Sequence, residues 1–447
     1  MNKAEFPIQK EYNCDVLVVG GGVSGISSAV AAARKGASVI LCETSGVLGG
    51  TATNGMVGPF MTCYDKKGKV QIIRGFYSEF VDAMLAENGA ISHRECHGSD
   101  SYGGYRVKGH IGVTPFSPES LKRVAERICL EAGVRLLYHS QFVGCQVSDK
   151  SIQCAYFATP AGIEAVNAKV YIDATGHASL AEKSGAEVFF GDEDGFVQTA
   201  STFFHITGVD KEFLDDHMAK NEEMRARYFM DIIEQGQKDG TFPCGTKKLR
   251  IYESVNGVWT VNMAQENETV NDLDTEALTR AEISQREQIK YIFQFLKKNI
   301  PGLENIRMVA SAANIGIRES QRMVGKTLLT GDDIVNSRYY DERIAVCANS
   351  VDVHCKNGVE YIACENNYYI PLSCLISKDV TNLLASGKCV SADKYAFSAI
   401  RVMPPCFAMG EAAGICAALS LQKDANRSLV DVKDVQAAII ENGGYLE

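Results

Sequence analysis

The chain has 447 residues, enough for two or three domains, and its 46% hydrophobic and 22% charged residues are typical of a globular protein with a sizeable core. The formal net charge of −10 leaves no basic face to neutralise phosphates, which argues against a nucleic acid or an anionic membrane as partner. The start of the chain lacks a long apolar region, and no stretch approaches the roughly 20 apolar residues of a membrane span. We therefore expect a cytoplasmic protein.

The 15 cysteines are scattered and odd in number, and no two are spaced as CxxC. This pattern excludes a disulfide scaffold, the simplest dithiol centre and the close-spaced ligands of ferredoxin-type clusters. His93, Cys96 and His97 could form part of a metal site, but their neighbours have the composition of a polar loop. We expect no metal.

The first elements in chain order form a complete βαβ unit. The β-branched run Asp15–Val19 ends at three glycines, and a helix of small residues follows from Ser24 to about Lys35. A second apolar run, Ala37–Cys42, ends at Glu43. A strand, a glycine turn, a helix and a second strand within about 30 residues predict a parallel pair of strands.

The elements after this unit alternate more loosely. A glycine- and threonine-rich loop covers 48–58, and helices are expected at about 76–87 and 118–132. Short β-branched runs predict four strands at 134–138, 141–147, 154–159 and 166–172. Downstream, we expect helical segments at 210–237, 275–298 and 405–421 and strands at 251–263, 343–346 and 383–386.

The character of the chain changes between about 191 and 316, where charges are denser and the βα alternation weakens. We predict an α/β protein with a discontinuous, doubly wound Rossmann-like domain and an inserted α+β cap domain. The expected division is a first part at 1–190, the insertion at 191–316, linking strands at 317–380 and a C-terminal part at 381–447. The amphipathic helix at 275–298 is expected at a domain surface or a dimer contact, so a homo-oligomer remains open.

The glycine turn is the strongest chemical signal. Gly20-x-Gly22-x-x-Gly25 follows a strand, opens a helix and precedes an acid at the end of the next strand. Gly20 permits the tight turn, Gly22 lets the backbone approach a pyrophosphate, and Gly25 allows helix and strand to pack closely. The helix N-terminus offers N–H groups to the phosphates, and Ser24 can add a hydroxyl. Glu43 is expected to accept hydrogen bonds from a ribose, which favours FAD or NAD over NADP.

Three later segments favour FAD over NAD. Gly49-Gly50-Thr51 follows the second strand almost at once, and Ala174-Thr175-Gly176 ends another strand. Near the C-terminus, the segment 387–393 leads towards Met403-Pro404-Pro405 and a second helix N-terminus. A cofactor as long as FAD can contact all of these segments, which are distant in sequence but are expected to return to the first domain. No second GxGxxG is followed by a helix and an acid, so a dedicated NAD(P)H domain is not expected.

Three blocks of sequence carry a family resemblance, at 18–53, 316–333 and 382–418, and the stretch 351–354 adds to it. The chain resembles the FAD-dependent oxidoreductases related to the glutathione-reductase and fumarate-reductase flavoproteins. The resemblance implies that Asp393 holds the ribityl hydroxyls and that the backbone of Val143 contacts the adenine. It implies that the isoalloxazine lies near Asn54, Gly55, Met403 and Pro404. The other implied FAD contacts are Gly20, Gly22, Ser24, Gly25, Glu43, Gly50, Thr51, Thr175 and Gly176.

Three residues are candidates for the chemistry at the ring. Arg318 can bind a substrate carboxylate or carbonyl, or stabilise reduced flavin; alternatively it forms a structural ion pair with Glu319. His354 can act as general acid or base, or be a hydrogen-bonded core histidine. Arg401 is expected close to the flavin, with a partner within the fold as the alternative.

Further candidates are weaker by their sequence context. His205 is a possible site residue inside an apolar run, and Cys406 is more consistent with an inert buried thiol than with a redox centre. Tyr368 and Tyr369 precede Ile-Pro-Leu and are expected to pack.

The expected function is FAD-dependent oxidation or reduction of a small organic substrate by hydride transfer at the flavin. Electrons would be exchanged with the substrate, with NAD(P)H bound transiently over the flavin, or with an external donor or acceptor protein. One rival is a flavin-bearing electron-transfer subunit that needs a partner. Another is an NAD-binding enzyme resembling thiazole synthase, which the segments at 49–51 and 393–405 disfavour.

Overall fold

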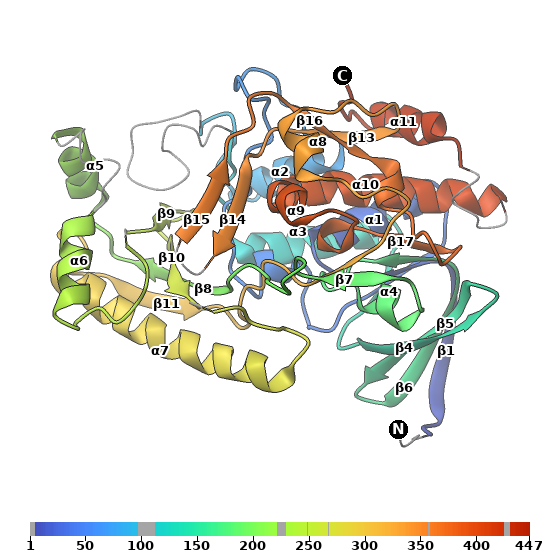
Figure 1. Ribbon diagram of the computed structural model, residues 1–447, viewed down its shortest axis with the longest axis horizontal. Helices are drawn as coiled ribbons and strands as arrows, with labels where there is room; N and C mark the ends of the chain where they lie inside the picture. Colours follow the sequence, from blue (N-terminus) through green and yellow to red (C-terminus); the bar gives the residue numbers. More distant parts are fainter. Residues whose placement is uncertain are drawn as a thin grey trace.

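The structure is a computed structural model and describes residues 5–96, 112–220, 229–247, 249–266, 268–355, 358–423 and 430–447. Two units are visible in Figure 1, a larger α/β unit and a smaller unit that contains the long helix α7 (Thr275–Asn299). Each unit has its own hydrophobic core. The core of the smaller unit is built from residues between Phe204 and Ile306.

The larger unit is organised around a seven-stranded mixed sheet in the order β3-β2-β1-β6-β5-β4, with β17 also paired to β6. Its strands are β1 (Ile8–Val19), β2 (Val39–Cys42), β3 (Arg135–Leu137), β4 (Gln141–Ser148), β5 (Ser151–Thr159), β6 (Gly162–Asp173) and β17 (Leu383–Ala385). The pairs β3–β2, β2–β1, β1–β6 and β6–β17 are parallel, whereas β5 and β4 continue the sheet antiparallel. The segment Val16–Val19 is at most 3% exposed, as expected for a central parallel strand covered on both faces.

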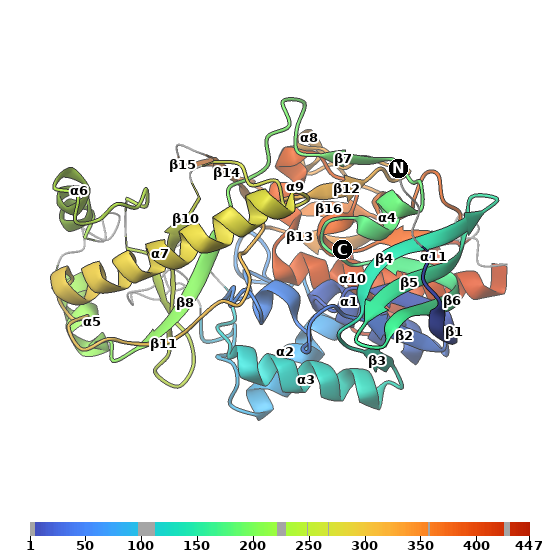
Figure 2. The ribbon, with the colours of Figure 1, turned by 90° about the horizontal axis from the view of Figure 1, so that it is seen from below.

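Two helices of small residues pack closely beside this sheet, α1 (Val23–Arg34) and α10 (Met403–Ser420), as Figure 2 shows. Gly410 and Gly414 lie one turn apart on α10, where a Cβ atom would stand 2.3 Å from the carbonyl oxygen of Ser24 and 2.2 Å from that of Ser28. Glycine at both positions therefore lets the two backbones approach. The hydroxyl of Ser27 donates to the Phe407 carbonyl at 2.7 Å and ties the helices together.

The remaining helices of the larger unit surround this pair and the sheet. They are α2 (Phe76–Ala86), α3 (Pro118–Glu131), α4 (Ser179–Lys183), α8 (Gly331–Val335), α9 (Lys394–Ile400) and α11 (Val432–Glu441). The segment Met403–Lys423 is long and apolar enough to cross a membrane, contrary to the sequence expectation, but 83% of its apolar 18-residue stretch is buried inside the protein. It is the central helix of the larger core.

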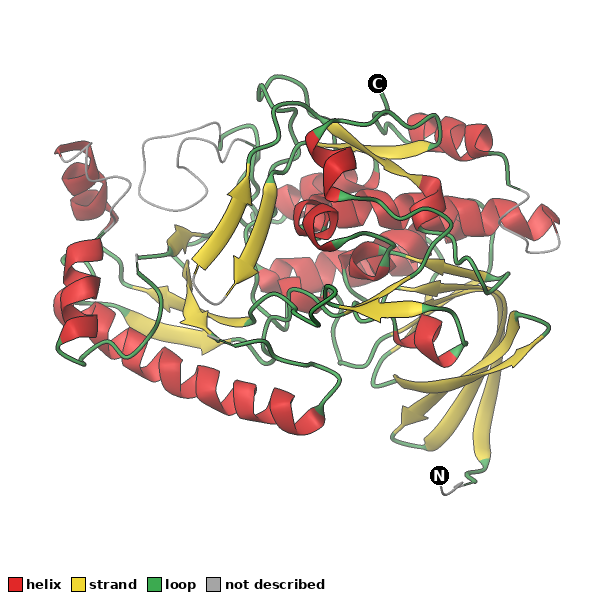
Figure 3. Ribbon diagram, in the orientation of Figure 1, coloured by secondary structure: helices red, strands yellow, loops and turns green. Residues whose placement is uncertain are grey.

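The smaller unit is a four-stranded sheet in the order β11-β8-β10-β9, with α7 packed along one face (Figure 3). Its strands are β8 (Ser201–Thr207), β9 (Ile251–Glu253), β10 (Trp259–Gln265) and β11 (Arg307–Ser311), and two further helices are α5 (Lys211–Lys220) and α6 (Met230–Lys238). The apolar stripe of α7 buries Ile289, Ile292, Phe295 and Leu296. The predicted amphipathic helix is thus confirmed, because its apolar spacing matches one helix face.

Three two-stranded sheets complete the described fold. They pair β7 (Val188–Phe190) with β12 (Gln321–Met323), β13 (Arg343–Cys347) with β16 (Tyr368–Pro371), and β14 (Val351–Cys355) with β15 (Gly358–Ile362). The hairpin β14–β15 stands between the two units in Figure 1. His354 lies within β14.

Candidate active site

The glycine turn after β1 has the geometry of a nucleotide-binding turn. Gly20 has φ +104°, and a Cβ there would stand 2.4 Å from the Ala174 carbonyl oxygen. A Cβ on Gly25 would stand 1.9 Å from the Gly20 carbonyl oxygen, so α1 lies against β1 only because this residue is glycine. At Gly22 a Cβ would meet nothing within 4 Å, which leaves open space at the start of α1.

The N-terminus of α1 is open to an anion. Gly22 is its N-cap, no side chain caps the helix, and no acidic residue stands in its first turn. The positive end of the helix dipole therefore faces this space without a protein anion. The segment after β2 lies beside it, because Gly49 donates to the Gly21 carbonyl at 2.8 Å and a Cβ on Gly50 would lie 3.1 Å from Gly22 Cα.

Glu43 lies at the end of β2 and holds the turn. Its Oε2 accepts a hydrogen bond from Gly21 N at 2.7 Å, and its Oε1 accepts one from Ser45 N at 2.8 Å. Each carboxylate oxygen keeps a second lone pair for a ligand hydroxyl. The carboxylate is thus oriented beside the glycine turn.

The ends of two further strands, β6 and β17, lie beside the start of α1. Thr175 and Gly176 follow β6, and the Thr175 hydroxyl donates to Asp173 Oδ1 at 2.7 Å. Gly387 follows β17 with φ +70°, and a Cβ there would stand 2.5 Å from Ser24 Oγ. Lys388 comes next, and its Cε lies 3.3 Å from the position of a Cβ on Gly176. Parallel strands that end at one sheet edge place these distant segments together.

A cavity of about 650 Å³ opens beyond these strand ends. Its walls come from the loop after Thr51, from β14, from α9 and the start of α10, and from the smaller unit through Leu249, Tyr252 and Asn262. The three candidate catalytic residues Arg318, His354 and Arg401 all line it. The structure therefore brings together three side chains that are separated by up to 83 positions in the chain.

Asp352 connects two of these candidates. Its Oδ2 lies 3.3 Å from His354 Nε2 and 3.8 Å from Arg401 Nη2, and Arg401 also donates to the Asp352 carbonyl at 3.0 Å. Burial alone would raise the pKa of Asp352, but the hydrogen bond from His354 and the charges of Arg401 and Arg318 hold it well below its usual range. Asp352 is therefore ionised at neutral pH.

Arg318 has only a carbonyl as partner in the described structure. Its Nη1 donates to the Thr199 carbonyl at 2.5 Å. Burial, with the neighbouring charge of Arg401, lowers the pKa of Arg318 to about 9. The predicted alternative, an ion pair between Arg318 and Glu319, is wrong, because Glu319 forms a buried ion pair with Arg322 instead.

The cavity carries an excess of positive charge in an acidic protein. Its cationic lining residues are Lys66, Arg250, Arg318, Lys388 and Arg401. Among the described residues that line the cavity, Asp352 is the only carboxylate. Lys388 Nζ donates to the Ile317 carbonyl at 2.7 Å, and burial lowers the pKa of Lys388.

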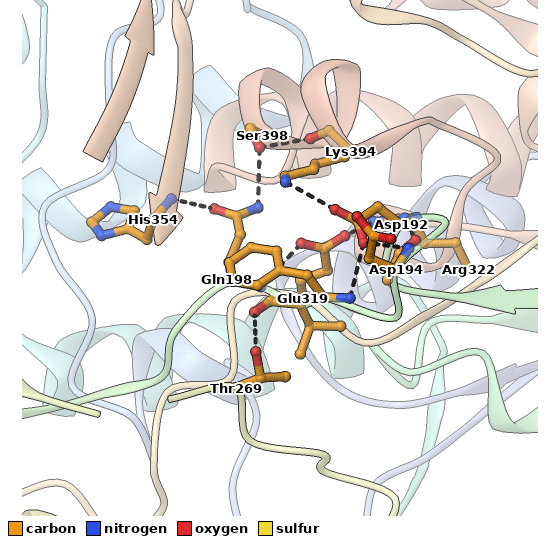
Figure 4. A network of polar contacts seen from close by, with 12 residues as sticks. Asp192, Asp194, Gln198, Thr269, Glu319, Arg322, His354, Lys394 and Ser398 are labelled. Atoms are coloured by element: carbon orange, nitrogen blue, oxygen red, sulfur yellow. Dashed lines mark hydrogen bonds and ion pairs between the residues drawn. The ribbon is translucent and has the colours of Figure 1, made fainter. Parts of the chain in front are cut away.

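A buried polar network holds the strand that carries His354, as Figure 4 shows. Gln198 Oε1 accepts a hydrogen bond from His354 N at 3.1 Å, and Gln198 Nε2 donates to Ser398 Oγ at 3.0 Å. The backbone N of Gln198 donates to Glu319 Oε2 at 3.2 Å, and Thr199 N donates to the His354 carbonyl at 3.2 Å. Gln198 and Thr199 thus fix β14 relative to Arg318 and to α9.

The sequence profile of the family described as FAD dependent oxidoreductase matches residues 15–439. The chain belongs to this family. Membership of this family supports FAD as the cofactor and disfavours the NAD-binding alternative.

Glutathione reductase from Schizosaccharomyces pombe (strain 972 / ATCC 24843) is 54% identical over 48 residues, which make up 11% of this chain and 10% of that enzyme. Among solved structures, the flavin-dependent brominase Bmp2 has a TM-score of 0.49 at 13% identity, covering 97% of this chain and 84% of the brominase. A geranylgeranyl bacteriochlorophyll reductase-like protein from Thermoplasma acidophilum has a TM-score of 0.45 at 13% identity, with 96% and 84% covered. Both TM-scores are below 0.5, so no activity is taken from these structures.

The residues around the glycine turn fit FAD. The open start of α1 accommodates a pyrophosphate, with N–H groups at Gly22 and Ser24 to hold it, and Glu43 would accept hydrogen bonds from the ribose. Gly50 and Gly176 border the same space. FAD, when bound, supplies two-electron redox chemistry beside the cavity.

Some of the predicted contacts to the isoalloxazine line the cavity, and others lie in the turn beside it. Thr51 and Met403 line the cavity, and Pro404 is the next residue of α10. Asn54 and Gly55 lie in the turn after Thr51, where the Asn54 carbonyl accepts a hydrogen bond from Ala313 N at 2.8 Å.

Two other predicted FAD contacts lie away from the cavity lining. Asp393 caps α9, and its two carboxylate oxygens accept hydrogen bonds from Ala396 N and Gly331 N, both at 2.8 Å. This carboxylate therefore holds α9 against α8. Val143 lies on the edge strand β4 with 47% of its surface exposed.

The weaker sequence candidates lie outside the cavity lining. His205 is buried on β8, and burial lowers its pKa to about 4. Cys406 is buried, and burial raises its pKa to about 12, as expected for an inert thiol. Tyr368 packs in the core and donates to the Ala399 carbonyl at 3.2 Å, and Tyr369 stacks edge-on with Tyr339.

The suggested metal fragment receives no support from the residues that the structure describes. His93 and Cys96 are buried, and His97 lies outside the described residues. No group of three or more His, Cys, Asp or Glu residues suited to a metal is found within the described ranges.

Sequence reasoning missed four cavity residues, Lys66, Arg250, Asp352 and Lys388, and also Gln198, which supports the strand of His354. Only Asp352 had a local signal, because residues two apart on a strand point to the same face and Asp352 therefore shares a face with His354. The others come from separate segments of the chain.

Proposed function

We propose that this FAD-dependent oxidoreductase binds a small organic anion in the cavity and transfers a hydride between that anion and the flavin. The observation that carries the proposal is the charge of the cavity, five cationic side chains against the single carboxylate of Asp352 among the described lining residues. Cations brought together without matching anions repel each other, so the site is stabilised when an anion enters.

The cationic side chains have unused donor capacity. Arg401 Nε is buried without a hydrogen-bond partner, and Arg318 donates to one carbonyl only. No hydrogen bond or ion pair of the Arg250 guanidinium is found within the described chain. Guanidinium groups bind carboxylates in a bidentate geometry, which suits an acid substrate. His354, next to these groups, is placed to exchange the proton that accompanies hydride transfer.

The proposal is tested by titrating the FAD-loaded protein with sodium acetate and with the neutral isostere acetamide, while the visible spectrum of the flavin is followed at constant ionic strength. Acetate is expected to shift the spectrum with saturation, and acetamide is not. Arg318→Met should weaken acetate binding at least tenfold, because it removes a buried guanidinium. Arg280→Met, which changes an arginine that is 69% exposed on α7, is the matched control and should leave the Kd unchanged.

A holoprotein whose flavin spectrum responds to no carboxylate would refute the anion site. Reduction of that flavin only by a protein donor would then favour the electron-transfer role.

A further inference from the structure

The two ring nitrogens of His354 have different environments. Nε2 lies 3.3 Å from Asp352 Oδ2, whereas Nδ1 is buried and has no hydrogen-bond partner in the described structure. An ionised carboxylate can only accept hydrogen bonds, so the proton of the neutral imidazole resides on Nε2. Nδ1 then carries a free lone pair. The His354 side chain lines the cavity, and only 8% of the residue is exposed.

The environment of His354 favours a base over an acid. Burial, followed by the charge of Arg318, lowers the pKa of His354 to about 4, so the imidazole is neutral near pH 7. A bound anion would offset the neighbouring cations and raise this pKa towards neutrality. The imidazole then gains affinity for a proton only when a substrate is present.

His354 and an anion-binding guanidinium lie next to each other. His354 Nε2 and Arg401 Nη2 both approach the same oxygen, Asp352 Oδ2, at 3.3 Å and 3.8 Å. A carboxylate held by Arg401 therefore places the adjacent carbon of the substrate close to the imidazole. The group that loses its proton to His354 is expected on this adjacent carbon.

The charge of the cavity also separates two chemical classes of acid. A 2-amino acid carries an ammonium group, which the five cationic side chains would repel and for which the described lining offers only Asp352, already engaged by His354 and Arg401. A hydroxyl group is neutral and can donate its proton to Nδ1. The site therefore favours a hydroxy acid over an amino acid.

We propose that the substrate is a 2-hydroxy acid, which is oxidised to the 2-oxo acid with His354 Nδ1 as the base that removes the hydroxyl proton. The proposal rests on the anion site described above. The C2–H bond of the substrate breaks and its electron pair leaves as hydride to the oxidised flavin. The hydroxyl proton moves to His354 Nδ1, and the C2–O bond becomes a carbonyl. The substrate is oxidised by two electrons, and FAD is the oxidant.

The test mixes the FAD-loaded protein anaerobically with glycolate, both enantiomers of lactate, and both enantiomers of mandelate. Glycine, alanine and phenylglycine, the amino analogues of the same acids, serve as comparators. Bleaching of the flavin absorption and formation of the 2-oxo acid are followed together. At least one hydroxy acid is expected to bleach the flavin with stoichiometric 2-oxo acid, and its amino analogue should react at least a hundredfold more slowly.

His354→Asn and His354→Gln test the role of the base. The backbone of His354 is held by Gln198 and Thr199 whatever its side chain, so both variants should fold and bind FAD. Each should lower the bleaching rate about 10²- to 10⁴-fold, the range that general-base catalysis supplies. The Kd of pyruvate, measured from its effect on the flavin spectrum, should change less than threefold, and the pH dependence of the bleaching rate should be lost.

The outcomes separate this proposal from the anion site on which it rests. If acetate and pyruvate perturb the flavin but no hydroxy acid of the panel reduces it, the hydroxy-acid assignment is overturned and the anion site stands. Faster reduction by an amino acid, or full activity of both His354 variants, also overturns it. If no carboxylate perturbs the flavin, both proposals fail.

Discussion

The buried ion pair between Glu319 and Arg322 gives the sharpest stability prediction. Both side chains are at most 1% exposed, and Arg322 Nη2 also donates to the Gly191 carbonyl at 2.8 Å. The Arg322 guanidinium lies 4.6 Å from the centroid of the Phe189 ring and 4.8 Å from that of Phe397. Arg322→Met keeps the aliphatic bulk but removes the charge and both hydrogen bonds.

This substitution leaves the Glu319 carboxylate buried without a cation, and breaking a buried pair in this way costs about 3–5 kcal/mol. The Gly191 carbonyl loses a donor, which contributes about 1–3 kcal/mol within that range if it stays unsatisfied. The remaining hydrogen bond from Gln198 N to Glu319 cannot neutralise the charge. We expect the free energy of unfolding to fall by about 3–5 kcal/mol.

The assay is urea denaturation of the holoprotein at one fixed, saturating FAD concentration, followed by far-UV circular dichroism. The double variant Glu319→Gln with Arg322→Met should lose much less than the sum of the single variants, because it removes the unpaired charge. Arg280→Met, which breaks the exposed pair with Glu276, is the control and should leave the midpoint unchanged. A loss below about 1 kcal/mol for Arg322→Met, or strict additivity, would refute the reasoning.

Three further predictions concern stability, pH and cofactor binding. Burial, the main cause, raises the pKa of Glu411 from 4.5 to about 6, so the folded protein holds this proton more tightly than the unfolded chain. The free energy of unfolding therefore falls by about 2 kcal/mol in total as pH rises from well below 4.5 to well above 6. Glu411→Gln should abolish this fall in a pH series of urea titrations, with Asn442 turning its amide to accept the new N–H; an unchanged pH slope would contradict the assignment. Gly414→Ala should lower the free energy of unfolding by about 1–3 kcal/mol, since its Cβ would stand 2.2 Å from the Ser28 carbonyl oxygen. Gly144→Ala, where a Cβ meets nothing within 4 Å, is the control in the same thermal melts, and equal Tm values would count against the close packing of α1 and α10. Gly25→Ala should weaken FAD binding at least tenfold in a fluorescence titration, because its Cβ would stand 1.9 Å from the Gly20 carbonyl oxygen; an unchanged Kd would refute the role of this contact.

The sequence by itself determined the local elements of the nucleotide site. Gly20, Gly22, Gly25 and Glu43 lie within 24 consecutive residues, so the strand, turn, helix and second strand could be predicted from spacing alone. The helices at 76–87, 118–132 and 275–298 were likewise predicted, with boundaries within about one residue of α2, α3 and α7. Short-range periodicity carries this information, because it depends on neighbours along one element.

Other features required the tertiary structure. Glu319 follows Arg318 in the sequence, which suggested an ion pair between them. In the fold, Glu319 pairs with Arg322, and Arg318 donates to the Thr199 carbonyl instead. Asp393 stays a predicted cofactor contact, and the fold adds that its carboxylate caps α9. In both cases the direction of a side chain depends on packing between distant segments, which spacing along the chain does not encode.

The cavity was decided entirely by tertiary contacts. Lys66, Arg250, Asp352 and Lys388 lie in four separate segments, and their meeting depends on how the smaller unit docks beside β14 and the strand ends. The long-range hydrogen bonds of Gln198 and Thr199 position His354 relative to Arg318 and α9. A sequence pattern can indicate that such residues are chemically able to act, whereas only the packed fold decides which of them share one site.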